Sequence, residues 1–300
     1  MKKMLASLFA LLAFATVINA QAPASRQPGM RFGPRIDTVK IWPEGAPNAF
    51  ELTEQQAAWT RGMGAGKVYS EAIMEVYPAR NPNGLCIVMC PGGAYAFESE
   101  DNEGRDMKDW FNARGITYCV LLYRLPYGHH DVPLSDALQA IRIMRSRKDL
   151  GITKVGIMGC SAGGHLASTA ATHYTDAASR PDFQILVYPV ITMDASFTHG
   201  GSRENLLGQN PSAELVDLYS NEKQVTADTP KAFIMLSSND RTVPVANSLR
   251  YYEALVGHKV SASMHIYPEG DHGWGWGDRF LYKNDWTSEL ADWLAREAAK

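Results

Sequence analysis

From Val155 to Ala171 the chain reads VGIMGCSAGGHLASTAA, and this stretch decides the fold. Its first five residues form an apolar run typical of a buried strand, and the small residues after Ser161 are typical of a closely packed helix. Gly159-Cys160-Ser161-Ala162-Gly163 lies between them and matches the G-x-S-x-G pattern of a nucleophile elbow. A turn this sharp strains the serine backbone, and the flanking positions must be glycine because a side chain there would collide with the strand or helix. An isolated G-x-S-x-G often occurs by chance, so its place between a strand and a helix carries the interpretation.

The same alternation of strand and helix patterns extends outward on both sides of this turn. Apolar runs are found at residues 85–90, 116–123, 155–159, 184–190, 232–238 and 261–268, after an extended segment at 70–79. Helical patterns cover residues 104–114, 135–147, 245–255 and 286–298 and also begin at Ser161. Short strands alternating with amphipathic helices predict an α/β fold in one domain, with a mainly parallel central sheet and helices on both faces.

A serine nucleophile needs a base and an acid that orients the base. Asp240 follows the apolar run AFIMLSS, and His272 follows SASMHIYP, so both lie just beyond the carboxyl ends of predicted strands. The order Ser, Asp, His is the one expected in this fold class. Asp194 is the alternative acid, whereas Asp271 is adjacent to His272 in sequence and is poorly placed to reach its ring. We therefore expect Ser161 as nucleophile, His272 as base and Asp240 as orienting acid.

Acyl transfer also requires hydrogen-bond donors for the developing oxyanion. The amide of Ala162 follows the nucleophile directly and is one candidate. The loop Pro91-Gly92-Gly93-Ala94-Tyr95 is the other, because it follows the run LCIVMC and its glycines allow backbone N–H groups to approach a substrate oxygen.

The N-terminus predicts export. Residues 1–20, MKKMLASLFALLAFATVINA, combine two lysines, a short apolar run and small residues, as in a secretory signal peptide. Residues 21–38 are predicted to be a flexible leader, and residues 39–300 the catalytic domain. We expect a secreted or periplasmic protein with no stable membrane span after cleavage, since the run is short for a span; a retained anchor is the alternative.

Composition excludes several other classes. The chain has 300 residues, 45% of them hydrophobic and 20% charged, with a net charge of −3. Loss of Lys2 and Lys3 with the signal makes this −3 − 2 = −5, and the basic residues form no patch, so we expect no nucleic-acid partner. No metal-ligand spacing is present, and we expect neither metal nor cofactor. The four cysteines lie in or beside apolar runs at residues 86, 90, 119 and 160, and we expect buried free thiols, although export makes a disulfide possible.

Five motifs, CPGGAYAF, YRLPYG, GCSAGGHLA, NDRTVP and EGDHGWG, give the chain its resemblance to a known group. It resembles α/β-hydrolase esterases of the hormone-sensitive-lipase-like branch and, more closely, bacterial acetyl xylan and feruloyl esterases, over roughly residues 70–295. The resemblance implies the triad Ser161, Asp240 and His272, and an oxyanion hole at Gly92, Gly93 and Ala162. Pro91 is a departure, because the lipase branch usually has histidine there.

The resemblance implies an acylated carbohydrate as substrate, such as acetylated xylan. Four aromatic residues in loops at the catalytic edge are candidates for stacking on sugar or feruloyl rings, with packing inside the fold as the alternative: Tyr95, Tyr127, Trp274 and Trp276. Residues 192–229 lie where this fold commonly inserts a small cap. A feruloyl esterase and a serine peptidase of the prolyl-oligopeptidase type are the alternative enzymes, and a binding protein without chemistry is the alternative class. The sequence leaves the oligomeric state open.

Overall fold

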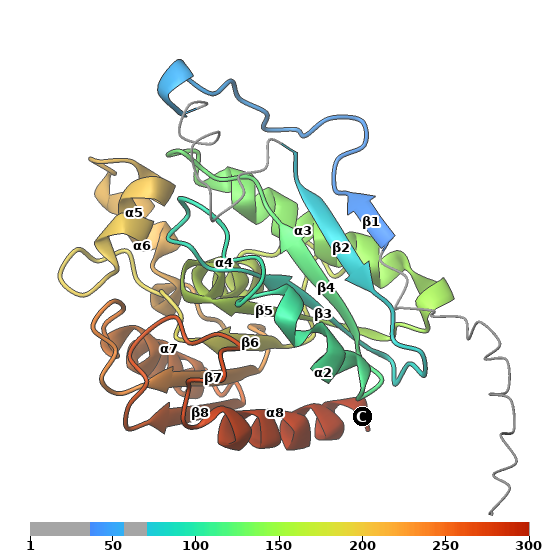
Figure 1. Ribbon diagram of the computed structural model, residues 1–300. Helices are drawn as coiled ribbons and strands as arrows, with labels where there is room; N and C mark the ends of the chain where they lie inside the picture. The colour runs from blue at the N-terminus through green and yellow to red at the C-terminus, as the bar shows by residue number, and fades with distance from the viewer. Residues whose placement is uncertain (1–36, 57–70, 300) are drawn as a thin grey trace, which may run out of the picture. The chain divides into compact units, whose positions relative to one another are not determined.

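The computed structural model describes residues 37–56 and 71–299. These residues form a central sheet of eight strands with helices around it (Figure 1). The predicted signal peptide and most of the predicted leader lie outside these residues. The strands are β1 (Asp37–Lys40), β2 (Ile73–Tyr77), β3 (Leu85–Cys90), β4 (Thr117–Leu122), β5 (Lys154–Cys160), β6 (Gln184–Val187), β7 (Ala232–Ser237) and β8 (Ala262–Tyr267). Their spatial order is β1-β2-β4-β3-β5-β6-β7-β8.

The sheet is mainly parallel. The six strands β3 to β8 run parallel to one another, whereas β2 near one edge is antiparallel to both β1 and β4. Strands β3, β4, β6 and β7 are buried at every position, because helices cover both faces and each strand must be apolar throughout. Only the edge strand β1 alternates between half-buried and exposed residues. It begins at Asp37, within the last two residues of the predicted leader.

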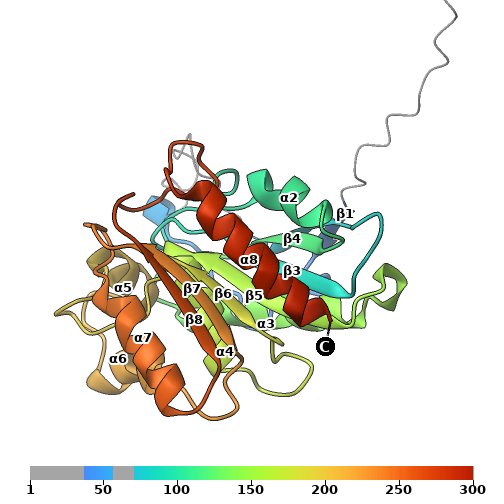
Figure 2. The same ribbon diagram turned by 90° about the horizontal axis from the view of Figure 1, so that it is seen from below.

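Helices cover both faces of the sheet. In Figures 1 and 2, α2 (Lys108–Asn112) and α8 (Lys283–Ala298) cover one face, and α3 (Asp131–Ser146) and α4 (Ser161–Thr172) cover the other. Helix α7 (Ala246–Gly257) contacts β8 at the far edge. The helix predicted at 104–114 divides into a short 3-10 turn, η1 (Arg105–Met107), and α2. The prediction of an α/β-hydrolase sheet is confirmed.

The segment from Thr192 to Thr229 connects β6 and β7. It contains α5 (Gly200–Leu207), α6 (Ala213–Tyr219) and the 3-10 turn η3 (Asn221–Lys223). Ser212 begins α6 as its N-cap, since its hydroxyl accepts a hydrogen bond from the Leu215 N–H. The side chain of Asn221 then ties η3 to α4 through the Ser168 hydroxyl and the His165 carbonyl.

All four cysteines are buried free thiols, as expected. Cys86 and Cys119 lie on the adjacent strands β3 and β4 with their Sγ atoms 3.8 Å apart, which is within reach of a weak thiol–thiol hydrogen bond and too long for a disulfide.

Candidate active site

Ser161 lies at the turn between β5 and α4, and its backbone is strained. Its φ angle is 53°, in the left-handed region that a residue with a side chain rarely adopts. The neighbouring glycines are required by space: a Cβ on Gly159 would lie 2.0 Å from the Gly163 carbonyl oxygen, and one on Gly163 would lie 2.0 Å from the Cys90 carbonyl oxygen. The close approach of α4 to β3 and β5 therefore explains the G-x-S-x-G pattern.

Ser161, His272 and Asp240 form a continuous hydrogen-bonded chain. The Ser161 Oγ lies 2.8 Å from His272 Nε2, and His272 Nδ1 lies 2.7 Å from Asp240 Oδ2. The three residues follow β5, β7 and β8, and the carboxyl ends of parallel strands meet at one edge of the sheet. The fold thus brings together side chains that are far apart in sequence.

Asp240 is held by its own loop. Its Oδ1 accepts hydrogen bonds from the backbone N–H groups of Thr242 and Val243, which leaves Oδ2 for His272. The alternative acids have other partners: Asp194 accepts from Ser196, and Asp271 pairs with Arg241. Asp240 is therefore the carboxylate that contacts the histidine.

The glycine loop after β3 differs from the prediction at one residue. The Gly92 N–H donates to the buried Glu103 carboxylate, with 2.8 Å between N and Oε2, so it is not free for a substrate oxyanion. Within the described parts of the chain, no acceptor pairs with the backbone N–H of Gly93 or of Ala162. Gly93 has φ 130°, and a Cβ there would lie 2.1 Å from the Phe97 carbonyl oxygen, so the loop needs glycine at this point. The assignment of Gly92 as a donor is wrong, because Glu103 occupies its N–H.

Helix α5 also contacts the glycine loop after β3, through Asn205. The Asn205 side-chain amide donates to the Ala94 carbonyl at 2.9 Å, and the Asn205 carbonyl accepts from the Gly128 N–H at 2.9 Å. The inserted segment between β6 and β7 is thereby attached to the loops that follow β3 and β4.

A cleft of about 490 Å³ opens beside His272. Asn102, Asp278 and Arg279 give it polar groups, and Trp274 and Phe280 give it apolar surface. Asp278 and Arg279 are exposed, so the cleft is open to solvent.

Two of the four aromatic residues proposed for substrate stacking are buried in the core. Tyr95 is 2% exposed, and its hydroxyl hydrogen-bonds to His165 Nδ1 at 2.9 Å. Trp274 is 7% exposed, stacks on Phe280 and donates its indole N–H to the Ser237 hydroxyl. Burial favours packing over substrate stacking for both rings, since their side chains turn inward and find polar partners inside the fold, although Trp274 also lines the cleft beside His272.

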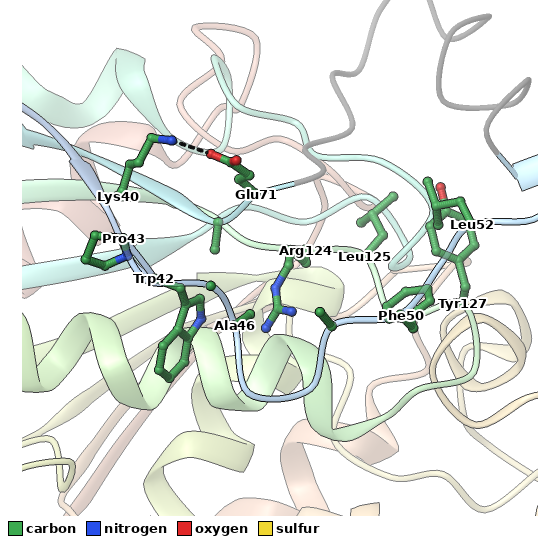
Figure 3. Close-up of a pocket in the computed structure, with 13 residues that line it drawn as sticks. Lys40, Trp42, Pro43, Ala46, Phe50, Leu52, Glu71, Arg124, Leu125 and Tyr127 are labelled. Carbon is green, nitrogen blue, oxygen red and sulfur yellow. Dashed lines mark hydrogen bonds and ion pairs between the residues drawn. The ribbon is translucent and has the colours of Figure 1, made fainter.

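The other two aromatic residues are half-buried. Trp276 packs edge-on against Trp110 and Trp286, with the Lys283 ammonium over its ring. Tyr127 lines a separate cavity of about 290 Å³ together with Trp42, Phe50 and Arg124 (Figure 3). Of the described residues around that cavity, none belongs to the Ser161, His272 and Asp240 chain.

Sequence reasoning missed two residues that contact this site. Glu103 is 4% exposed and accepts from the Gly92 N–H, and Tyr188 lies after β6 with its ring centroid 4.7 Å from that of His272. Tyr188 directly follows strand β6, but the apolar run at residues 184–190 includes it, so the sequence did not mark it as a residue beyond a strand end. Glu103 lies in an irregular segment after the glycine loop and carried no such signal.

Within residues 37–56 and 71–299, no group of three or more His, Cys, Asp and Glu side chains is arranged to hold a metal ion. Across the same residues, no helix has the length and apolar character that a membrane span requires.

The fold and the site define an α/β-hydrolase with a Ser-His-Asp arrangement at the nucleophile elbow. The family model for the prolyl oligopeptidase family matches residues 124–300, more than half of the chain, and the chain belongs to this family.

Two relatives with named activities are similar to most of the chain. It is 40% identical over 231 residues to "Acetylxylan esterase" of Xylanibacter ruminicola, a match covering 75% of this chain and 48% of that protein. It is 36% identical over 205 residues to "Endo-1,4-beta-xylanase B" of Butyrivibrio fibrisolvens, covering 63% of this chain and 32% of that protein. The chain thus spans less than half the length of both curated relatives.

Among solved structures, an acetyl ester-xyloside bifunctional hydrolase from Caldicellulosiruptor lactoaceticus is similar to nearly the whole chain. The TM-score is 0.74 and the identity 34%, with 89% of this chain and 98% of that one covered.

Proposed function

We propose that this chain is a secreted serine esterase that removes acetyl groups from xylan or its fragments. The observation that supports the proposal is the pair of hydrogen bonds that links Ser161, His272 and Asp240. Ser161 Oγ lies 2.8 Å from His272 Nε2, and His272 Nδ1 lies 2.7 Å from Asp240 Oδ2. Such a chain makes a neutral hydroxyl nucleophilic, since the imidazole takes its proton and the carboxylate stabilises the resulting imidazolium.

The proposed reaction proceeds through an acyl-enzyme. Ser161 Oγ attacks the ester carbonyl while His272 Nε2 takes its proton, and the N–H groups of Gly93 and Ala162 stabilise the oxyanion. His272 then protonates the departing sugar oxygen as the ester bond breaks. Water, deprotonated by His272, attacks the acyl-enzyme, and acetate leaves as Ser161 regains its proton.

Two observations support a carbohydrate as the leaving group. His272 must lie beside the leaving oxygen, and the cleft next to this residue offers the polar groups of Asn102, Asp278 and Arg279. The relatives named above are an acetylxylan esterase, a xylanase and an acetyl ester-xyloside hydrolase. Together with the export signal predicted in residues 1–20, these relatives favour action on plant polysaccharide outside the cytoplasm. In this proposal residues 39–300 are the catalytic domain and residues 192–229 are its cap.

The test is a set of parallel assays on the purified chain, each with Ser161→Ala as control. We expect acetate release from acetylated xylooligosaccharides and its loss in Ser161→Ala. Ferulate release from feruloylated oligosaccharides would instead favour a feruloyl esterase, and cleavage of a prolyl dipeptide amide would favour a peptidase. Cleavage of an aryl acetate with none of these would refute the polysaccharide substrate while leaving the esterase.

A further inference from the structure

Glu103 is a buried carboxylate whose two oxygens contact two different loops beside Ser161. Its Oε2 accepts from the Gly92 N–H and its Oε1 accepts from the Tyr188 hydroxyl, each at 2.8 Å. Tyr188 in turn accepts from the Gly275 N–H at 2.7 Å, and its ring packs against the His272 ring. One side chain therefore joins the glycine loop after β3 to the histidine loop after β8.

We propose that Glu103 is a positioning residue. It holds the oxyanion donor, the Gly93 N–H, and the base, His272, in the relative positions that reaction at Ser161 requires. This inference rests on the proposed esterase function and adds a residue to its machinery. Glu103 does not touch the reacting atoms. It acts through Gly92, whose fixed peptide orients the following Gly93 N–H, and through Tyr188, which supports His272.

The cost of burying this group argues for such a role. A carboxylate withdrawn from water is destabilised, and burial raises the pKa of Glu103. If core packing alone were needed, an apolar side chain would serve at lower cost. Both oxygens of Glu103 instead accept hydrogen bonds from the loops that flank Ser161, and a Cβ on Gly92 would lie only 2.4 Å from Oε2. The loop approaches the carboxylate as closely as glycine allows.

Glu103 also interacts electrostatically with the titratable groups around it, among them His272. The titratable groups that face it are Tyr123 at the end of β4, Cys160 at the end of β5, Tyr188 and His272. All but His272 are groups that are neutral when protonated, and burial raises the pKa of each of these three. Both oxygens of Glu103 accept hydrogen bonds, as those of an ionised carboxylate do, and a negative charge at this position attracts the imidazolium of His272 that arises during the reaction. Asp240, Asp271 and His199 are the other charged or titratable neighbours of His272.

Glu103→Gln tests the proposal, because glutamine has the same shape but only one acceptor oxygen and cannot accept from both Gly92 and Tyr188. With p-nitrophenyl acetate we expect kcat to fall by about tenfold to a hundredfold while KM changes less than about threefold, because only transition-state contacts are misaligned. The acid limb of the kcat/KM profile should move to lower pH, because the imidazolium loses a nearby negative charge. Tyr188→Phe should lower kcat in the same way, by a smaller factor.

Glu98→Gln is the matched control. Glu98 is a fully buried glutamate in the same segment, but its contact is the Tyr123 N–H, which a glutamine oxygen can still accept. We expect wild-type kcat and an unmoved acid limb. Wild-type kcat and pH profile in both Glu103→Gln and Tyr188→Phe would overturn the proposal, as would equal losses in Glu98→Gln and Glu103→Gln.

Fluorophosphonate labelling separates this result from failure of the proposed function. Wild-type protein that fails to label at Ser161 would refute the serine esterase itself. Labelled wild-type protein with a fully active Glu103→Gln variant would refute only the role of Glu103.

Discussion

The Nδ1 atom of His272 lies 2.7 Å from Asp240 Oδ2, and only 1% of the Asp240 side chain is exposed. A buried carboxylate at this distance holds the imidazole in the tautomer with hydrogen on Nδ1, so that Nε2 faces the Ser161 hydroxyl as a base. The contact fixes both the orientation and the protonation pattern of the ring.

Asp240→Asn should therefore lower kcat by roughly 10⁴-fold while leaving some activity, because the histidine remains but the wrong tautomer is favoured. Steady-state kinetics on p-nitrophenyl acetate measure this. Asp194→Asn is the control, since Asp194 contacts Ser196 in a turn and should retain wild-type kcat. Full activity of Asp240→Asn together with loss in Asp194→Asn would transfer the acid role to Asp194.

The positions of most strands along the chain, and the grouping of Ser161, His272 and Asp240, were accessible from sequence for one reason. In a parallel sheet buried on both faces, every strand is an apolar run, and the residue after each run lies at the same edge. Ser161 and Asp240 follow the buried strands β5 and β7, and His272 follows the half-buried edge strand β8, so reading the polar residues after these three runs was enough to find them. The edge strand β1 is half exposed and only four residues long, so it gave no apolar run and its start was predicted to be leader.

The errors concern directions that local sequence does not encode. Gly92 and Gly93 are equivalent by composition, yet the N–H of one meets Glu103, eleven residues further on, and that of the other does not. Tyr95 follows them at φ 59°, and this left-handed turn carries its ring into the core toward His165. Which amide is free and which ring is buried depend on tertiary partners that no spacing rule supplies.

His165 makes folding stability depend on pH. Both ring nitrogens are engaged in the core: Nε2–H donates to the Tyr219 carbonyl and Nδ1 accepts from the Tyr95 hydroxyl. Burial lowers the pKa of His165 from 6.5 to about 4, so between these values the unfolded chain binds a proton that the folded chain does not. This contribution to the free energy of unfolding is intact above pH 6.5 and is lost as the pH falls toward 4, by about 3 kcal/mol in all.

Urea unfolding at pH 7, 5.5 and 4.5 measures that dependence. His165→Gln should be less stable at pH 7, because a buried hydrogen-bonded ring is lost, but its stability should fall less steeply between pH 6.5 and 4.5. His258→Gln is the control at an exposed histidine and should keep the wild-type slope. An unchanged slope in His165→Gln would assign the pH dependence to other groups.

Gly163→Ala should destabilise the fold, whereas Gly257→Ala should not, although both substitutions add one methyl group at a helix end. A Cβ at Gly163 would lie 2.0 Å from the Cys90 carbonyl oxygen and 2.4 Å from that of Pro91, both backbone atoms that cannot move without shifting β3 and the glycine loop. A Cβ at Gly257, the last residue of α7, meets no atom within 4 Å. We expect a loss of about 3 kcal/mol or more in the free energy of unfolding for Gly163→Ala, and no loss or a gain of up to about 1 kcal/mol for Gly257→Ala. Urea unfolding of the two variants and of wild type measures this difference. Equal stability of the two variants would mean that α4 can move away from the sheet. The close approach of α4 to the sheet would then not be required for the Ser161 turn.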